Sequence, residues 1–183
     1  MQLIPEYSGS YRAGYNCQNL QFFSELGSRM ASMGTLESIH QLIVDFVTEA
    51  VHCDSCLVYI LRGDQLVLSA SKHPHPNLIN RLSLPLGEGI TGWVAEHREP
   101  VAINENAWAD PRFRKFHELP EDTFEAFLSV PILCHSFVVG VINVQHREAY
   151  RFTDHQIRLV ATIGYLVGVN FVDLTTPRSR FVA

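Results

Sequence analysis

Long apolar runs and an excess of basic charge are both missing from this chain. No apolar run approaches the roughly 18 residues that a membrane-spanning helix needs. Lys and Arg number 14 against 19 Asp and Glu, and the formal net charge of −5 at pH 7 disfavours nonspecific nucleic-acid binding. The amino terminus lacks a cationic start and an apolar core, so no secretory signal is expected. We therefore expect a cytoplasmic protein that binds neither nucleic acid nor a membrane.

Cysteine is scarce as well. Cys17, Cys53, Cys56 and Cys134 are too few to form a disulfide framework, and a reducing compartment suits them. The CxxC from Cys53 to Cys56 is typical of a zinc or redox site, but no second CxxC or spaced histidine pair completes four ligands. If Cys56 already lies in a strand, the two thiols should point to opposite faces. We favour structural thiols, with a redox switch as the alternative.

Signatures of catalysis are also missing. The sequence contains no nucleophile elbow and no recognisable spacing of a nucleophile and its base, so we predict no catalytic residues, no metal ligands and no enzyme. A G-x-G-x-x-G pattern at Gly87, Gly89 and Gly92 follows an expected strand and opens an expected helix. It lacks a βαβ setting and a following acidic residue, which disfavours a dinucleotide site. A tight turn with a helix–sheet contact is the simpler interpretation, although the helix amides could face an anionic group.

Helix and strand periodicities are present over most of the chain. They predict an irregular arm over residues 1–15, one domain over 16–172 and a polar tail over 173–183. A helix from Cys17 should end at Gly34, and Thr35 should cap the next helix. The other expected elements are strands at 55–61, 65–71, 82–86, 100–103, 126–133 and 137–145, a short helix at 91–97 and a closing helix capped by Thr153. Sequential hairpins favour an antiparallel sheet, so the pattern predicts an α+β sandwich.

Several motifs at compatible spacings carry a family resemblance. They are LPLGEGITGWVAEHREP at 84–100, ADPRF at 109–113, FLSVPI at 127–132, VGVINVQ at 139–145 and RFTDHQ at 151–156. Together they resemble a GAF domain, a small-molecule-sensing module of signalling proteins, over roughly residues 20–171. The resemblance implies a central antiparallel sheet of five to six strands with the terminal helices on one face. A loop-and-helix roof over a ligand pocket is implied on the other face.

The expected roof runs from Leu86 to Thr123. It includes the long polar and aromatic segment 104–123, and loops longer than about 12 to 15 residues are usually functional or mobile. Alternatives stay open at two positions: Trp93 could anchor its helix to the core, and Asp110 could cap the turn that begins at Pro111. The predicted ligand-binding residues are Tyr59, Ser69, Trp93, Asn104, Asn106, Trp108, Asp110, Phe113 and Ser129.

Cyclic-nucleotide-binding members of the resembled family carry an Asn-Lys…Phe…Asp-Glu pattern near the last strand. Phe152 and Asp154 match the end of that pattern. His146, Arg147 and His155 depart from it, which disfavours cyclic GMP and cyclic AMP. The ligand therefore stays unidentified by sequence.

Other branches of the resembled family bind haem or act as enzymes. Haem-binding members need an axial histidine, and His97 and His117 are the positional candidates. The enzymatic branch, free methionine sulfoxide reductase, works through cysteines in the roof and on a neighbouring strand. Residues 84–123 contain no cysteine, which disfavours that activity.

These observations favour a non-catalytic cytosolic sensor that binds a small molecule and relays the signal through its terminal helices. The apolar stripes of those helices could pack across a two-fold axis, giving a homodimer that acts on an output domain or partner protein. The alternative is a dimerisation or interaction module whose pocket is filled by its own Phe116, Leu119 and Phe124. A thiol-based redox enzyme or sensor is less favoured.

Overall fold

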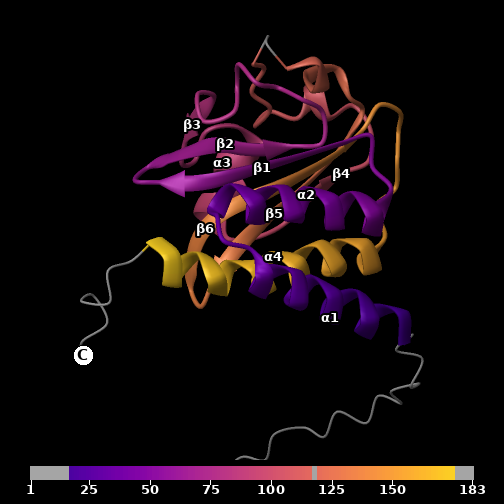
Figure 1. The fold of residues 1–183 in the computed structure, drawn as a ribbon. Helices are drawn as coiled ribbons and strands as arrows, with labels where there is room; N and C mark the ends of the chain where they lie inside the picture. Colours follow the sequence, from indigo (N-terminus) through magenta and orange to yellow (C-terminus); the bar gives the residue numbers. More distant parts are fainter. Residues whose placement is uncertain (1–16, 117–118, 176–183) are drawn as a thin grey trace, which may run out of the picture.

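The computed structural model describes residues 17–116 and 119–175 (Figure 1). The predicted arm lies outside the described residues, as does the predicted tail from residue 176 onward; residues 173–175 belong to the last helix. The elements are α1 Cys17–Ser32, α2 Leu36–Val51, β1 Ser55–Arg62, β2 Gln65–Ser71, β3 Ser83–Pro85, α3 Gly89–His97, β4 Val101–Ile103, β5 Ala126–Cys134, β6 Phe137–His146 and α4 Asp154–Thr175. Two short 3-10 helices, η1 Ala107–Ala109 and η2 Pro120–Thr123, lie between β4 and β5.

Side-chain caps fix where the long helices begin, as predicted at both threonines. The Thr35 hydroxyl accepts a hydrogen bond from the Ser38 N–H at 3.2 Å at the start of α2. Before α4, the Gln156 N–H donates to the Thr153 hydroxyl at 3.2 Å, and the Thr153 N–H donates to Gln156 Oε1 at 3.0 Å. This reciprocal arrangement is a capping box, and it sets the angle at which α4 returns over the sheet.

The start of α3 differs from the prediction. The helix begins at Gly89 rather than at Thr91, and Glu88 occupies the N-cap position without a side-chain cap bond. Gly87 and Gly89 have φ angles of 79° and 69°, a left-handed conformation that glycine adopts without strain. Thr91 is consequently buried inside the helix, and its hydroxyl serves the site described below.

The six strands form one antiparallel sheet in the order β3-β2-β1-β6-β5-β4. Its two central strands, β1 and β6, come from distant parts of the chain, and the remaining strands extend outward as hairpins or short edges. The predicted α+β class with five to six antiparallel strands is confirmed. The sheet therefore offers two faces that the other elements cover differently.

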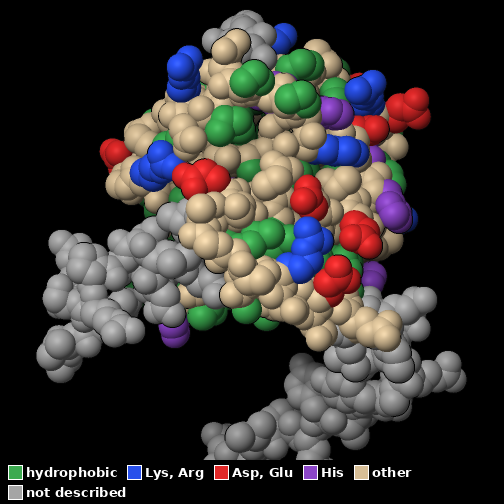
Figure 2. Space-filling view, viewed as in Figure 1, with side chains coloured by type: hydrophobic (Ala, Val, Ile, Leu, Met, Phe, Trp, Pro, Cys, Tyr) green, Lys and Arg blue, Asp and Glu red, His purple; other side chains and the backbone are tan. Residues whose placement is uncertain are grey.

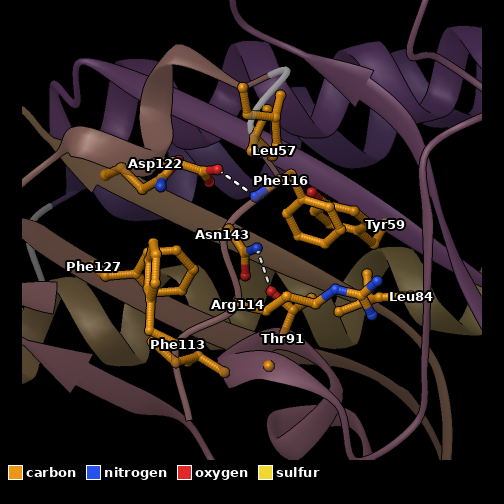
Figure 3. A pocket seen from close by; sticks show the side chains of 14 residues that line it. Leu57, Tyr59, Leu84, Thr91, Phe113, Arg114, Phe116, Asp122, Phe127 and Asn143 are labelled. Carbon is orange, nitrogen blue, oxygen red and sulfur yellow. Dashed lines mark hydrogen bonds between the residues drawn. The ribbon is translucent and has the colours of Figure 1, made fainter. Parts of the chain in front are cut away.

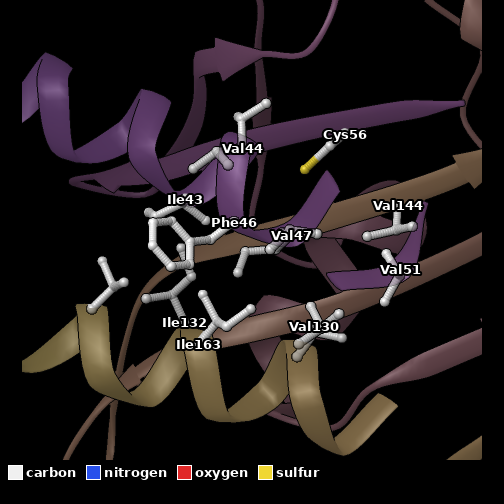
Figure 4. Close-up of a cluster of buried hydrophobic side chains, with 14 of the residues drawn as sticks. Ile43, Val44, Phe46, Val47, Val51, Cys56, Val130, Ile132, Val144 and Ile163 are labelled. Carbon is white, nitrogen blue, oxygen red and sulfur yellow. The ribbon is translucent and has the colours of Figure 1, made fainter. Parts of the chain in front are cut away.

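Helices α1, α2 and α4 lie together on one side of the sheet (Figure 1). Alternate residues of the central strands point toward them and form a dry apolar core, because side chains on a strand alternate between faces. Figure 4 shows Phe46 and Val47 from α2, Ile163 from α4, and Val130 and Ile132 from β5 together in this core. A second apolar cluster on the opposite face includes Leu57, Tyr59, Leu84, Val94 and Phe127, and α3 packs over it.

The CxxC cysteines lie on the same side of the sheet, so the expectation of opposite faces is wrong. Cys53 and Cys56 are both buried in the helix-side core. Cys53 comes before β1, in the turn after the left-handed His52, so strand alternation does not extend to it. Burial raises the pKa of both thiols, most strongly for Cys56, which disfavours the reactive thiolate form.

Charged side chains do not gather by sign on the face shown in Figure 2, where acidic and basic groups are interspersed. None of the helices in the described ranges 17–116 and 119–175 is both long enough and apolar enough to span a membrane.

Candidate functional site

A small, partly open cavity lies between the sheet and a roof made of α3 and the described residues of the segments 104–116 and 119–125 (Figure 3). Its volume is about 30 Å³. This is room for about two water molecules, whereas ligand pockets are usually about 300–1,000 Å³. The lining residues are Leu57, Tyr59, Leu84, Gly89, Ile90, Thr91, Phe113, Arg114, Phe116, Leu119, Asp122, Phe127, Asn143 and Gln145.

A chain of hydrogen bonds crosses the floor of this cavity. The Ser129 hydroxyl on β5 donates to Asn143 Oδ1 on β6 at 2.8 Å, and the two residues are direct cross-strand partners. Asn143 Nδ2 donates to the Thr91 hydroxyl on α3 at 2.8 Å (Figure 3). All three side chains are buried. The chain thus ties the roof helix to the central strands through polar groups in an otherwise apolar layer.

A second polar group surrounds Glu121 of η2, whose side chain is only 3% exposed. Its Oε1 accepts hydrogen bonds from the Ser55 hydroxyl at 3.3 Å and pairs with His75 Nε2 at 3.0 Å. Gln145 Nε2 donates to the Glu121 carbonyl at 3.3 Å. Glu121 therefore connects the roof to β1, to β6 and to the segment after β2. It also lines an open groove on the outside, with His73, Phe124 and Arg147 among its neighbours.

The electrostatic environment of the cavity is negative at this end. Burial raises the pKa of the Tyr59 hydroxyl well above its usual range, and the negative charges of Asp122 and Glu121 raise it further. The carboxylate of Asp122 accepts a hydrogen bond from the Phe116 N–H (Figure 3). The cation nearest the cavity, Arg114, forms an ion pair with Glu88 at the edge of the roof.

Gly89 and Gly92 of α3 lie where other parts of the chain approach the helix closely. A Cβ placed on Gly92 would lie 2.6 Å from the Pro85 carbonyl oxygen, so the helix can approach the sheet only without a side chain there. A Cβ on Gly89 would meet the Arg114 Cβ at 3.2 Å, which means that the Arg114 side chain covers the start of the helix. These contacts agree with the simpler interpretation of the motif as a tight turn with a helix–sheet contact.

Of the predicted lining residues, Tyr59 and Phe113 line the cavity. Ser129 lies beneath it and reaches it through Asn143. Ser69 does not line it, because β2 carries a bulge at this point: Val58 pairs with Ala70, and Tyr59 pairs with Leu68. Ser69 is the extra residue, and its hydroxyl donates to the Val67 carbonyl at 3.1 Å.

Trp93 and Asp110 do not line the cavity. Trp93 is half-buried and packs against the second apolar cluster, which agrees with the alternative that it anchors its helix to the core. The Trp93 ring stacks on His97 with ring centroids 4.0 Å apart, and the Arg112 guanidinium lies 4.8 Å from the Trp93 ring. Arg112 in turn donates to both carboxylate oxygens of Asp110, at 2.9 and 2.8 Å, and this lowers the pKa of Asp110. Asp110 also accepts from the Arg112 N–H, which is the turn-capping role weighed for it.

Asn104, Asn106 and Trp108 do not line the cavity either. Asn104 accepts hydrogen bonds from the backbone before α4, including one from the Phe152 N–H. Asn106 takes a left-handed φ of 53° and its N–H donates to the Glu125 carboxylate. Trp108 is 54% exposed in a shallow surface depression. The segment first contributes to the cavity lining at Phe113; in its earlier part Ala107 is buried, but Asn104, Asn106 and Trp108 lie away from the cavity.

Sequence reasoning missed Thr91, Asn143, Gln145, Glu121 and Asp122. A signal existed for two of them: Asn143 and Gln145 alternate with apolar residues in VGVINVQ, which places two polar side chains on one face of a buried strand. No comparable pattern marks the acidic pair, because its burial depends on how the whole roof folds.

The described residues also bear on the metal and haem candidates of the sequence. Across the described residues, no group of three or more His, Cys, Asp or Glu side chains is placed to bind a metal ion. His97 stacks on Trp93 and is 44% exposed, and His117 lies outside the described residues. No cysteine lines the cavity.

A six-stranded antiparallel sheet with helices on one face and a roof over a small cavity on the other is the architecture of a signalling sensor module. The family model for the GAF domain matches residues 35–171, well over half of the 183 residues. The chain belongs to the GAF domain family.

Relatives of known description agree with this assignment. Over 111 residues the chain is 28% identical to proteins of the phosphoenolpyruvate-dependent phosphotransferase system from Escherichia coli and Salmonella typhimurium. The match covers 60% of this chain and 15% of each of those proteins, so it concerns only a small part of their length.

Solved structures show the same fold. The GAF domain of an Acinetobacter phosphoenolpyruvate-protein phosphotransferase superposes with a TM-score of 0.76 at 23% identity, covering 89% of this chain and 98% of that one. The equivalent domain from Coxiella burnetii gives 0.77 at 24% identity, covering 86% and 95%. The free methionine-R-sulfoxide reductase of Neisseria meningitidis, solved with its substrate, gives 0.70 at 14% identity, covering 94% and 99%.

Proposed function

We propose that this GAF domain is a non-catalytic cytoplasmic sensor that binds a small molecule between its sheet and its roof. The observation that carries the proposal is the buried chain from Ser129 through Asn143 to Thr91. Buried polar groups must be hydrogen-bonded to avoid a desolvation cost, and apolar residues would fill this layer more simply. A polar floor beneath aromatic roof residues is what a small-molecule site requires.

The proposed relay runs through β5 and β6 to α4. Ser129 and Asn143 point toward the roof, while their neighbours Leu128 and Ile142 point into the helix-side core. The α4 backbone lies close against β5: a Cβ on Gly164 would be 3.1 Å from the Pro131 carbonyl oxygen. With so little space, a shift of β5 on ligand binding would have to move α4.

The signal would then leave through the helical side. On α4, Tyr165 is 52% exposed and Val169 is 54% exposed. We propose that these apolar side chains contribute to a homodimer formed by the terminal helices. The dimer would transmit the change to an output domain or a partner protein, a change of subunit arrangement that ligand binding can drive.

The size of the cavity favours the alternative of an interaction module with a self-filled pocket. Phe116 and Leu119 line the remaining space of about 30 Å³, together with Phe113. Phe124, the third residue predicted to fill the pocket, lines the outer groove instead. Under this alternative no small molecule enters, and the helical surface carries the whole function.

Thermal unfolding of the full chain separates the sensor from the interaction module. It is measured with a panel of amines, amino acids, organic acids, nucleotides and haem. The sensor proposal expects at least one compound to raise the melting temperature. It expects that effect to vanish in an apolar-floor variant carrying Thr91→Val, Ser129→Ala and Asn143→Leu. The matched control is Trp108→Ala, which removes an exposed roof aromatic outside the cavity and should leave the stabilisation unchanged. No stabilisation by any compound would favour the interaction module.

A further inference from the structure

Two buried oxygen atoms at the acidic end of the cavity have no hydrogen-bond partner among the described residues. They are Oε1 of Gln145 and Oε2 of Glu121, and each side chain is 3% exposed. Gln145 lines the cavity itself. Glu121 stands in the wall between the cavity and the outer groove, with its carbonyl bonded to the Gln145 amide nitrogen.

The chemistry of these atoms fixes what can satisfy them. The Gln145 amide must turn its nitrogen toward the Glu121 carbonyl, so the remaining oxygen is an acceptor. The free oxygen of an ionised Glu121 is also an acceptor. Leaving such groups unpaired in the interior costs about 1–3 kcal/mol each, and more for a charged group. Their missing partner is therefore a hydrogen-bond donor.

The charges at this end of the cavity also favour a hydrogen-bond donor. The carboxylates of Glu121 and Asp122 are both less than 10% exposed and lie close enough to Tyr59 for their negative charge to act on its hydroxyl. Arg114 is already paired with Glu88 at the edge of the roof. His75, which is paired with Glu121 Oε1, leaves the second oxygen of that carboxylate unmatched. A positively charged donor would therefore be attracted to this end.

The rest of the lining is mainly apolar, with Thr91, Asn143 and the Glu88-paired Arg114 as its polar members. Rings from Phe113, Phe116 and Phe127 surround the space between the floor and the roof (Figure 3). Aromatic faces contribute apolar contact area and attract cations through their quadrupoles. An apolar body of comparable size could take the place of the Phe116 ring when the roof moves outward.

We propose that the ligand of this site is a small organic ammonium ion carried on an aromatic or branched apolar body. Its N–H groups donate to Gln145 Oε1, beside the carboxylates of Glu121 and Asp122, and its body packs among Phe113, Phe116 and Phe127. The proposal rests on the sensor function proposed above and specifies the chemical class that the site accepts.

The test uses three probes of nearly equal shape: 2-phenylethylamine, 2-phenylethanol and phenylacetate. Each is titrated calorimetrically into the full chain at pH 7, where the probes are respectively cationic, neutral and anionic. The amine is expected to bind at least tenfold more tightly than the alcohol, and the carboxylate is expected not to bind. Binding by the carboxylate alone would overturn the charge assignment while leaving the sensor proposal intact.

Two variants locate the contact. Asp122→Asn removes a charge but keeps an oxygen for the Phe116 N–H, and Glu121→Gln keeps an acceptor for Ser55 and His75. Each should weaken amine binding about tenfold and leave alcohol binding unchanged. Glu105→Gln removes one charge from an exposed position and serves as the matched control. Circular dichroism of each variant confirms folding.

Several outcomes would overturn the ammonium proposal. One is amine binding that is equal in wild type and in both acidic-end variants. Another is failure of all three probes when some other compound of the panel stabilises the protein, which would leave the two orphan oxygens to ordered water. If no compound of any class binds, the sensor proposal fails together with it.

Discussion

Replacing the polar floor of the cavity gives a quantitative test of its design. Asn143 is 2% exposed and makes hydrogen bonds of 2.8 Å to both Ser129 and Thr91. The single change Asn143→Leu leaves the fully buried Ser129 hydroxyl without its acceptor and the Thr91 hydroxyl without its donor. At about 1–3 kcal/mol for each unsatisfied group, offset in part by the buried leucine, we expect a loss of about 2–4 kcal/mol.

The apolar-floor variant behaves differently under the same reasoning. When Thr91→Val and Ser129→Ala accompany Asn143→Leu, all three side chains of the hydrogen-bonded set become apolar, so none of them is left with an unpaired polar group. Replacing all partners of a hydrogen-bonded set by apolar groups of similar shape is close to neutral. We therefore expect this variant to recover most of the stability that Asn143→Leu loses, so that the three effects are strongly non-additive.

Urea unfolding followed by circular dichroism measures both quantities. A loss of about 2–4 kcal/mol corresponds to a melting temperature lower by roughly 5–15 °C for a domain of this size. If the stability changes of the three single variants simply add in the triple variant, the three residues do not act as one hydrogen-bonded unit. That result would refute the argument. A stable triple variant that binds nothing would mean that the polar floor serves binding rather than folding.

Other perturbations address the turn before α3 and the helix-side core. Gly92→Ala should destabilise the protein by about 2 kcal/mol or more, because the added Cβ lies 2.6 Å from the Pro85 carbonyl oxygen. Gly27→Ala is the matched control, because its added Cβ has nothing within 4 Å. Equal losses of stability at both positions would contradict this argument. Burial lowers the pKa of His40 from 6.5 to about 4. The unfolded chain therefore binds a proton first as the pH falls below 6.5, and stability should drop by about 2 kcal/mol between pH 7.5 and 5. His40→Gln should remove that part of the pH dependence of stability in urea unfolding. An unchanged dependence of stability on pH in this variant would contradict the role of His40.

Much of the fold was predictable because its signals are local. The caps at Thr35 and Thr153 depend on residues three positions apart, and a strand such as β5 is a short, mainly apolar run, as expected where both faces of a sheet are covered. The start of α3 was misplaced because Thr91 has the right chemistry for a cap. The cavity floor recruits its hydroxyl instead, through a contact with Asn143 that is 52 residues away in the sequence.

The site was less predictable because it depends on long-range placement. Ser69 was predicted to line the pocket, but a bulge that no local sequence pattern predicts takes it out of the strand pairing. Asn104, Asn106 and Trp108 belong to a polar, aromatic loop of the kind that often lines ligand sites, yet they lie on its outer part. In the sequence Glu121 and Asp122 resemble solvent-exposed loop charges, and only the folded structure shows that they are buried.

The cavity is small because the roof is closed, and the contacts that close it differ in kind from those on the helical side. The helix-side core is apolar and fully buried, so its separation from the sheet would expose large side chains such as Phe46 and Ile163. The roof near Phe116 also packs on an apolar cluster, but polar contacts help to hold it, including the hydrogen bond from the Phe116 N–H to Asp122 and a half-exposed ion pair between Arg114 and Glu88. A partly exposed ion pair contributes about 0–1 kcal/mol and a hydrogen bond to a charged group about 1.5–3 kcal/mol. If the apolar body of the ligand replaces the packing that the roof rings lose, breaking these polar contacts reduces the apparent affinity by roughly 10–1,000-fold. The same difference means that a ligand would displace the roof, and that the rigid β5–β6 pair would carry the change to α4.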